Sequence, residues 1–280
     1  WRKQTQKCRA AKRIAAWVVR SMSAQERIFV QIASYRDVDC QWTVKDLFDN
    51  ATQPERVSVG ICWQFEEKAD QDCFREKAPR PDQVRKVSFD ARQSKGPCWA
   101  RLQAQKLWRG EEYTLQINSH MRFEKGWDDR LLAMLKKCRG DRPVLSTYPR
   151  SFAPPRQILS PGVVAKIVAK EFDAQGNLVL WSSVAPADDA MASPTPSAFL
   201  AGSFLFGPAS IIADVPSDPH LYFFGEDVTL SVRLWTHGYD IHAPNEADVD
   251  LSPYQEPPSG AIVTRSLASS KAPSNTSGLT

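Results

Sequence analysis

The sequence predicts an α/β protein with a mostly parallel central sheet and helices on both faces. Short apolar runs have the length of buried strands, apolar residues at helical spacing separate them, and the two patterns alternate from Ile28 to Thr147. Parallel strands need a crossover segment, usually a helix, so this alternation is typical of a parallel sheet. With 280 residues the chain can bury a core without disulfides or metal staples.

The first predicted strand is the run Ile28–Ala33, broken only by Gln31, and the turn-like segment 34–37 follows it. Apolar residues from Val44 to Ala51 then fall at the spacing of a helix. The same signals predict strands at 57–62, 84–89, 113–117 and 144–147, and helices over 100–108 and 127–135.

The second half of the chain is less regular. The segments 163–172 and 178–184 flank a turn-like sequence, which predicts a hairpin. Residues 185–197 carry three prolines and predict a loop. A further helix containing Leu230 and Leu234 is expected to end at His237-Gly238, a cationic last turn followed by a glycine.

Composition excludes several classes of protein. A content of 42% apolar and 10% aromatic residues excludes a chain disordered throughout. The net charge is only +4, and basic residues mix with acidic ones beyond the first twenty, so no nucleic-acid partner is expected. The longest apolar window, 198–213, is interrupted by two glycines and a proline, which indicates buried core and not a membrane span.

The chain divides into three predicted parts. Residues 1–26 form a basic extension, residues 27–252 the globular domain, and residues 253–280 a Ser- and Pro-rich disordered tail. The six cysteines contain no CxxC pair, which argues against a zinc knuckle and favours buried free thiols. Free thiols predict a cytoplasmic location; the Golgi lumen is the alternative if an N-terminal anchor was removed.

Three polar groups stand where a ligand site is expected, at strand ends and at a helix start. They are 34–37, 118–120 and 225–227. In the middle group, Asn118 and His120 are two residues apart, so on an extended strand both side chains face one side. Amide oxygen and imidazole are acceptable ligands for a Mn²⁺-like ion, although a polar triplet after a strand is also typical of a simple turn.

Several blocks of the sequence together resemble a known enzyme family. They occur in order from Ile28 to Pro244 and include FVQIASYRD at 29–37, GPCWAR at 96–101, NSHMRF at 118–123 and FFGED at 223–227. In this order they resemble the glycosyltransferase family of the Skp1 hydroxyproline N-acetylglucosaminyltransferases.

The resemblance implies a GT-A fold and a retaining transfer of N-acetylglucosamine from UDP-N-acetylglucosamine (UDP-GlcNAc) to a protein hydroxyl, hydroxyproline in the relatives. A divalent cation, Mn²⁺ or Mg²⁺, is implied as cofactor, because departure of UDP leaves negative charge on the diphosphate. UDP-sugar and an acceptor protein are the implied partners.

The resemblance also implies roles for nine residues. The resemblance places Ser34, Arg36 and Asp37 at the uridine. It gives Arg101 and Arg122 contacts to phosphate or sugar, although an arginine is as readily used in an ion pair. The metal segment contains Asn118 and His120, and the acidic pair that meets the acceptor or the sugar hydroxyls is Glu226 and Asp227.

Two departures from the family pattern bear on activity. The relatives have Asp where this chain has Asn118, so one charge is lost from the metal segment, and the histidine that follows the last strand in relatives has no counterpart. Asp250 is the residue that can replace that ligand. The alternative function is therefore a weakened relative that binds a nucleotide sugar or a Pro-rich peptide without turnover.

Overall fold

The computed structural model describes residues 26–153, 157–158, 165–184, 193–246 and 249–251. Residues 1–25 of the predicted basic extension and the whole predicted tail at 253–280 lie outside the described residues.

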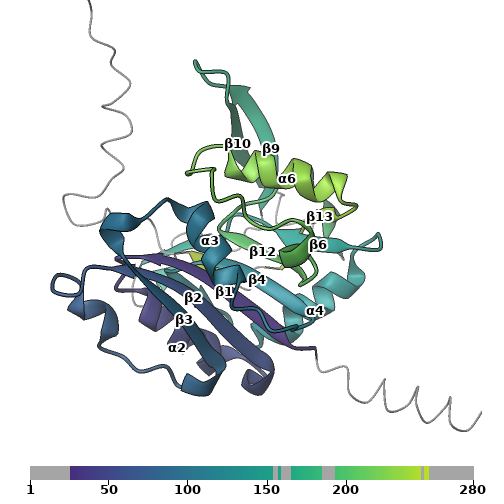
Figure 1. The fold of residues 1–280 in the computed structure, drawn as a ribbon. Coiled ribbons are helices and arrows are strands. Elements are labelled where there is room, and N and C mark those ends of the chain that lie inside the picture. Colours follow the sequence, from purple (N-terminus) through teal and green to yellow (C-terminus); the bar gives the residue numbers. More distant parts are fainter. Residues whose placement is uncertain (1–25, 154–156, 159–164, 185–192, 247–248, 252–280) are drawn as a thin grey trace, which may run out of the picture.

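An eight-stranded sheet forms the centre of the molecule, in the order β11-β13-β6-β12-β4-β1-β2-β3 (Figure 1). β1 pairs in parallel with β2 and β4, β2 with β3, and β6 with β13, whereas β12 is antiparallel to both of its neighbours. The predicted mostly parallel sheet is thus confirmed. Its strands are β1 (Ile28–Tyr35), β2 (Val57–Phe65), β3 (Val84–Asp90), β4 (Tyr113–Asn118), β6 (Pro143–Ser146), β11 (Thr195–Pro196), β12 (Phe204–Pro208) and β13 (Asp240–Ala243).

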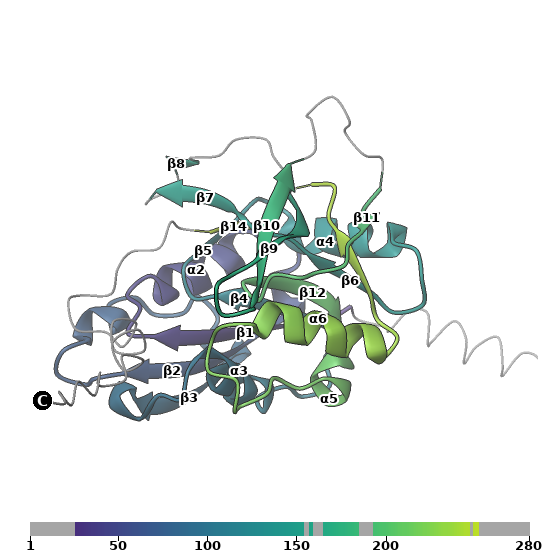
Figure 2. The ribbon, with the colours of Figure 1, turned by 90° about the horizontal axis from the view of Figure 1, so that it is seen from above.

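Helices cover both faces of this sheet, as predicted (Figure 2). On one face, α2 (Cys40–Asn50) and α4 (Trp127–Lys137) pack on alternate side chains of β1 and β4, such as Ile32 and Ile117. On the other face lie α3 (Pro97–Gln105), α5 (Ile211–Asp214) and α6 (Glu226–Thr236). Short 3₁₀ turns complete the set: η1 (Pro54–Arg56), η2 (Gln71–Phe74), η3 (Pro81–Gln83) and η4 (Ala91–Gln93).

The start of α4 shows how side chains fix the helices to the sheet. The carboxylate of Asp128 is fully buried and accepts the backbone N–H groups of Thr52 and Gln53 at 2.7 and 3.0 Å. It also pairs with Arg56 at 2.8 Å. Burial alone raises the pKa of Asp128, but these donors outweigh it and the net pKa is lowered. One buried anion therefore ties α4 to the segment that leads into β2.

A smaller four-stranded sheet and a hairpin lie beside the main sheet. The hairpin of β9 (Ala165–Phe172) and β10 (Leu178–Val184) projects from the body (Figure 1) and confirms the predicted turn at 173–177. The small sheet, in the order β5-β14-β7-β8, was not predicted, because its strands are two to four residues long and show no periodicity. They are β5 (Met121–Phe123), β7 (Arg150–Ala153), β8 (Gln157–Ile158) and β14 (Val249–Leu251).

The described residues contain no helix of the length and apolarity needed to cross a membrane. The apolar window around β12 is buried, as predicted, with Phe204, Leu205 and Phe206 at most 3% exposed.

Candidate active site

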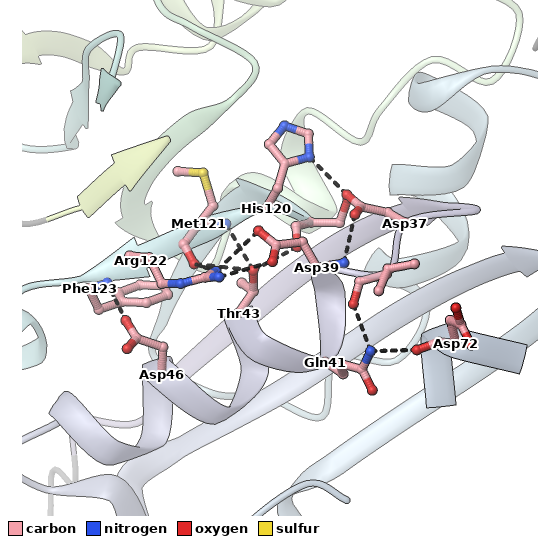
Figure 3. Close-up of polar contacts among 12 residues, drawn as sticks. Asp37, Asp39, Gln41, Thr43, Asp46, Asp72, His120, Met121, Arg122 and Phe123 are labelled. Atoms are coloured by element: carbon pink, nitrogen blue, oxygen red, sulfur yellow. Dashed lines mark hydrogen bonds and ion pairs between the residues drawn. The ribbon is translucent and has the colours of Figure 1, made fainter. Parts of the chain in front are cut away.

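The first polar cluster lies at the edge of the sheet where β1 and β4 end (Figure 3). The two strands are in register, with Ala33 opposite Asn118, so the segments that follow them meet. Nδ1 of His120 lies 2.8 Å from Oδ2 of Asp37, and the hydroxyl of Ser119 donates to the same oxygen. The predicted meeting of these two polar groups is observed.

Asp37 is an anion that fixes the tautomer of His120. Burial raises the pKa of Asp37, but hydrogen bonds and charge from His120, and hydrogen bonds from Ser119 and from the backbone of Asp39, outweigh it and leave the pKa below its usual value. An ionised carboxylate only accepts hydrogen bonds, so Nδ1 carries a hydrogen, and in the neutral imidazole the lone pair is then on Nε2. No described residue hydrogen-bonds to Nε2 of His120.

The loop that presents His120 is held against α2. The hydroxyl of Thr43 donates to the carbonyl of Ser119 at 2.7 Å and accepts the N–H of Met121 at 2.8 Å (Figure 3). Arg122 is buried and makes a two-point ion pair with Asp39, at 2.9 and 3.2 Å. These contacts give the segment after β4 a fixed geometry. The sequence left Arg122 open between an ion pair and a contact to phosphate or sugar. In the structure its guanidinium is engaged in the ion pair with Asp39.

Asn118 is the last residue of β4. Because Leu115 and Ile117 face the core under α2 and α4, the alternation of the strand turns Asn118 toward the face covered by α3 and α6. Its side-chain amide has no hydrogen-bond partner among the described residues. β4 ends at Asn118, so strand alternation does not determine the direction of the His120 side chain. The side chains of Ser119 and His120 both turn to Asp37.

Asp250 lies on β14, where its backbone is opposite Arg122 of β5 and hence two residues from His120. The side chain of Asp250 lies outside the described part of the structure, so its role as a metal ligand stays a prediction. Among the side chains that the structure describes, no three of His, Cys, Asp or Glu cluster in a way that could hold a metal ion.

A second cluster is buried between α3 and the start of α6. Oε2 of Glu226 accepts a hydrogen bond from Nη1 of Arg101 at 2.6 Å and one from the thiol of Cys98 at 2.9 Å. Oδ1 of Asp227 accepts the N–H of Gly202 at 2.7 Å. These residues line one pocket, together with Gln116, Ser217, Asp218, Leu221, Thr229, Leu230 and Arg233.

The two neighbouring carboxylates of this pocket differ in environment. Burial raises the pKa of Asp227 to about 6, with a further contribution from the charge of Glu226. Glu226 instead lies in the ion pair with Arg101. Burial also raises the pKa of Tyr148, which hydrogen-bonds to Asp227, to about 12. The pocket therefore combines a paired anion with a carboxyl group that exchanges its proton near neutral pH.

Two predicted residues at the end of β1 turn away from both clusters. Ser34 is fully buried and belongs to β1, because its neighbour Tyr35 still pairs with Gln64 of β2. Arg36 has a left-handed backbone with φ of 50°, and its guanidinium pairs with Glu66 and Asp70, at 3.0 Å each. The predicted turn at 34–37 thus begins two residues later than expected.

Sequence reasoning missed Cys98, Gln116, Tyr148 and Gly202. Cys98 lies inside the GPCWAR block and Gly202 inside the apolar window, but neither position carries a local signal of its role. Their roles depend on the packing of α3 against α6, which joins residues 125 positions apart in the Arg101–Glu226 pair.

Comparisons with known proteins bear on both the fold and the family. The family model described as Glycosyltransferase (GlcNAc) matches residues 27–86 and 66–258. No curated protein matches the chain in sequence.

Among solved structures, GalNAc-T7 with UDP, GalNAc and Mn²⁺ superposes with a TM-score of 0.65 at 14% identity, over 84% of this chain and 45% of that one. This likeness confirms the GT-A-like fold, and the chain spans less than half the length of GalNAc-T7. Residues 1–349 of TarS from S. aureus give a TM-score of 0.48 at 11% identity, over 81% of this chain and 60% of that one.

Proposed function

We propose that this chain, which belongs to the Glycosyltransferase (GlcNAc) family, transfers N-acetylglucosamine from UDP-GlcNAc to a hydroxyl group of a protein. The observation that carries the proposal is the Asp37–His120 pair, held beside Asn118 at the edge where β1 and β4 end. Ligands of α/β proteins bind at this edge, where loops that follow the strands converge.

The Asp37–His120 pair supports a divalent cation at this edge of the sheet. Histidines that ligate metals donate their other ring N–H to a carboxylate, the arrangement that Asp37 gives His120. Nε2 of His120, the amide oxygen of Asn118 and the carboxylate of Asp250 are the proposed ligands, a mixed set that suits Mn²⁺ better than Mg²⁺. GalNAc-T7 was solved with Mn²⁺ and UDP. When bound, the cation would stabilise negative charge on the departing diphosphate.

The donor would extend from this edge into the pocket of the second cluster. Gln116 lines that pocket and lies two residues before Asn118 on the same face of β4, so the side chain of Asn118 is directed toward the side of the sheet on which the pocket lies. We assign the sugar to the pocket, with Arg101 on the sugar side and Arg122 on the phosphate side. The uridine is assigned to the end of β1, at Ser34, Arg36 and Asp37, where Arg36 would offer chiefly its backbone because Glu66 and Asp70 hold its side chain.

Glu226 and Asp227 are the proposed catalytic pair. Glu226, ionised beside Arg101, would accept hydrogen bonds from hydroxyls of the donor sugar. The pKa of Asp227, which burial raises to about 6, suits a group that takes a proton from an acceptor hydroxyl near neutral pH. As the family resemblance implies, the transfer would retain the configuration of the anomeric carbon.

Exposed aromatic side chains beside the pocket support a polypeptide acceptor. Tyr222, Phe223 and Phe224 are 47, 61 and 61% exposed and lie between Leu221 and Glu226, which both line the pocket. Aromatic surfaces of this kind bind extended and Pro-rich segments, which fits the hydroxyproline acceptor of the relatives.

A donor screen tests the proposal. UDP release is measured across nucleotide sugars, with Mn²⁺, with Mg²⁺ and with neither, for the wild-type protein and for His120→Ala. We expect metal-dependent release from UDP-GlcNAc that is lost in His120→Ala. Release without metal, or equal release by the variant, would contradict the proposed site.

The neutral side chain of Asn118 favours a second candidate, a relative that binds the nucleotide sugar without turnover. Calorimetry with UDP, with and without Mn²⁺, separates the two. The enzyme requires metal-enhanced UDP binding, whereas a binding module does not.

The domain division and the location are also proposals. The family match from residue 27 to 258 supports a catalytic domain at 27–252 between the extension and the tail. The five described cysteines, Cys40, Cys62, Cys73, Cys98 and Cys138, are all free thiols, which supports the cytoplasm over the Golgi lumen.

A further inference from the structure

The N-terminal part of α3 directs two donors at one carboxylate oxygen. Cys98 and Arg101 are three residues apart and so lie on the same face of the helix. The thiol of Cys98 lies 2.9 Å from Oε2 of Glu226, and Nη1 of Arg101 lies 2.6 Å from the same atom. Both donors are less than one-tenth exposed.

The other oxygen of Glu226, a residue that lines the pocket, has no such donors. Oε1 accepts no hydrogen bond from any described residue. It faces the bare Cα of Gly202: a Cβ built there would lie 2.6 Å from Oε1, 3.0 Å from Nη1 of Arg101 and 3.0 Å from Oδ1 of Asp227. The side chains of Glu226, Arg101 and Asp227 thus pack directly against the backbone of residue 202, an approach that a larger residue would disturb.

The hydrogen of the Cys98 thiol belongs to this arrangement. Burial, together with the charge of Glu226, raises the pKa of Cys98 to about 12, so the sulfur keeps its hydrogen and donates it. Nε of Arg101 is buried and has no hydrogen-bond partner among the described residues.

We infer that Cys98 is a positioning residue: with Arg101 it engages Oε2 of Glu226, so that Oε1 alone faces the pocket and accepts a hydroxyl of the donor sugar. The inference rests on the proposed function, because the ligand is the sugar of the nucleotide donor. It assigns no covalent chemistry to the thiol.

The test compares binding of UDP-GlcNAc with binding of UDP, both by calorimetry with Mn²⁺, in the wild type, Cys98→Ala and Cys98→Ser. The ratio of the two affinities measures the hold on the sugar. We expect Cys98→Ala to lower this ratio roughly 3- to 10-fold, the worth of one ordinary hydrogen bond, because a thiol is a weak donor, with UDP affinity unchanged. Cys98→Ser keeps a donor and should retain most of the ratio. Cys138→Ala, which removes a thiol outside the pocket, is the matched control.

The outcomes separate the two proposals. If the wild type binds both ligands and Cys98→Ala keeps the wild-type ratio, or if Cys98→Ser loses as much as Cys98→Ala, the role of Cys98 is wrong while the proposed function stands. If UDP-GlcNAc binds the wild type no better than UDP, no sugar is held and the inference is overturned. If neither ligand binds, the proposed function fails, and the inference fails with it.

Discussion

The two polar clusters of the candidate site are built in different ways. The cluster of Asp37 and His120 stands at the open edge of the sheet, where the side chains of both residues remain at least one-fifth exposed. The cluster of Arg101 and Glu226 is buried between two helices, with side chains only 10 and 15% exposed. Strand register creates the first cluster, whereas helix packing creates the second.

This difference teaches where each cluster is vulnerable. Charges at the exposed edge can reach water, so substitutions there should alter ligand binding more than folding. Charges in the buried pocket depend on each other, so removing one leaves another without compensation. Stability and binding measurements should therefore separate the two clusters.

The largest effect is expected from Arg101→Met, which leaves Glu226 as a buried, uncompensated anion. We expect a loss of about 3–5 kcal/mol in the free energy of unfolding, measured by urea denaturation. The matched variant Arg122→Met should cost less, because Asp39 is 22% exposed and can be hydrated. The double variant Arg101→Met/Glu226→Gln should recover part of the loss. Equal losses in the two single variants would remove the distinction between the clusters.

A pH series on Asp227→Asn probes the buried cluster alone. The folded-state pKa of Asp227, about 6, lies above the ordinary aspartate pKa of 3.8, so the native state favours the neutral form. This contribution to stability is fully present below pH ~4, falls as the pH rises and is gone above pH ~6, a total of about 3 kcal/mol. Asp227→Asn should therefore gain stability relative to wild type over this range, measured by urea unfolding at each pH. A difference that does not change with pH would contradict the assignment.

Asp37→Asn probes the exposed edge. The amide nitrogen cannot accept the hydrogen bonds that His120 and Ser119 donate to Oδ2, so the imidazole loses its fixed tautomer. We expect metal affinity, measured by calorimetry with Mn²⁺ and UDP, to fall about 10- to 100-fold. The melting temperature should change far less than in Arg101→Met. A large loss of stability with unchanged metal affinity would show that Asp37 has a purely structural role.

Asn118→Asp is expected to have the smallest effect, and in the opposite direction. It restores a charge to the proposed metal segment at a position with no competing partner among the described residues. We expect about a 10-fold gain in metal-dependent UDP release, the worth of one charge-assisted contact. Asn50→Asp, at the end of α2, is a control that adds the same charge outside the proposed metal segment. If Asn118→Asp brings no gain, the idea that this asparagine limits activity is wrong.

Much of the fold was predictable because its strands are buried on both faces. β1 and β2 appear in the sequence as largely apolar runs, β4 alternates apolar and polar residues, and the helices between them show clear spacing. The antiparallel direction of β12 was not predictable, since its apolar run reads like those of the parallel strands in the same sheet. Nor was β13, which is only four residues long.

In the candidate site, too, contacts set by strand order were predictable and contacts set by helix packing were not. The meeting of Asp37 with Ser119 and His120 follows from the rule that parallel strands end at one edge, and it was predicted. The pairing of Arg101 with Glu226, and the place of Gly202 beside them, depend on how α3 and α6 pack, which no local pattern records. The ion pairs that engage Arg36 and Arg122 likewise required three-dimensional neighbours.

The pairing of β1 with β4 has a consequence for assembly. A slip of one residue between these strands would turn Asn118 to the opposite face and carry His120 away from Asp37. A sheet with this slipped register would lack the proposed nucleotide site, so UDP binding would report only on the correctly folded protein. Added UDP should slow hydrogen exchange at the backbone amides of β1 and β4, because a ligand that binds only the native state stabilises that state.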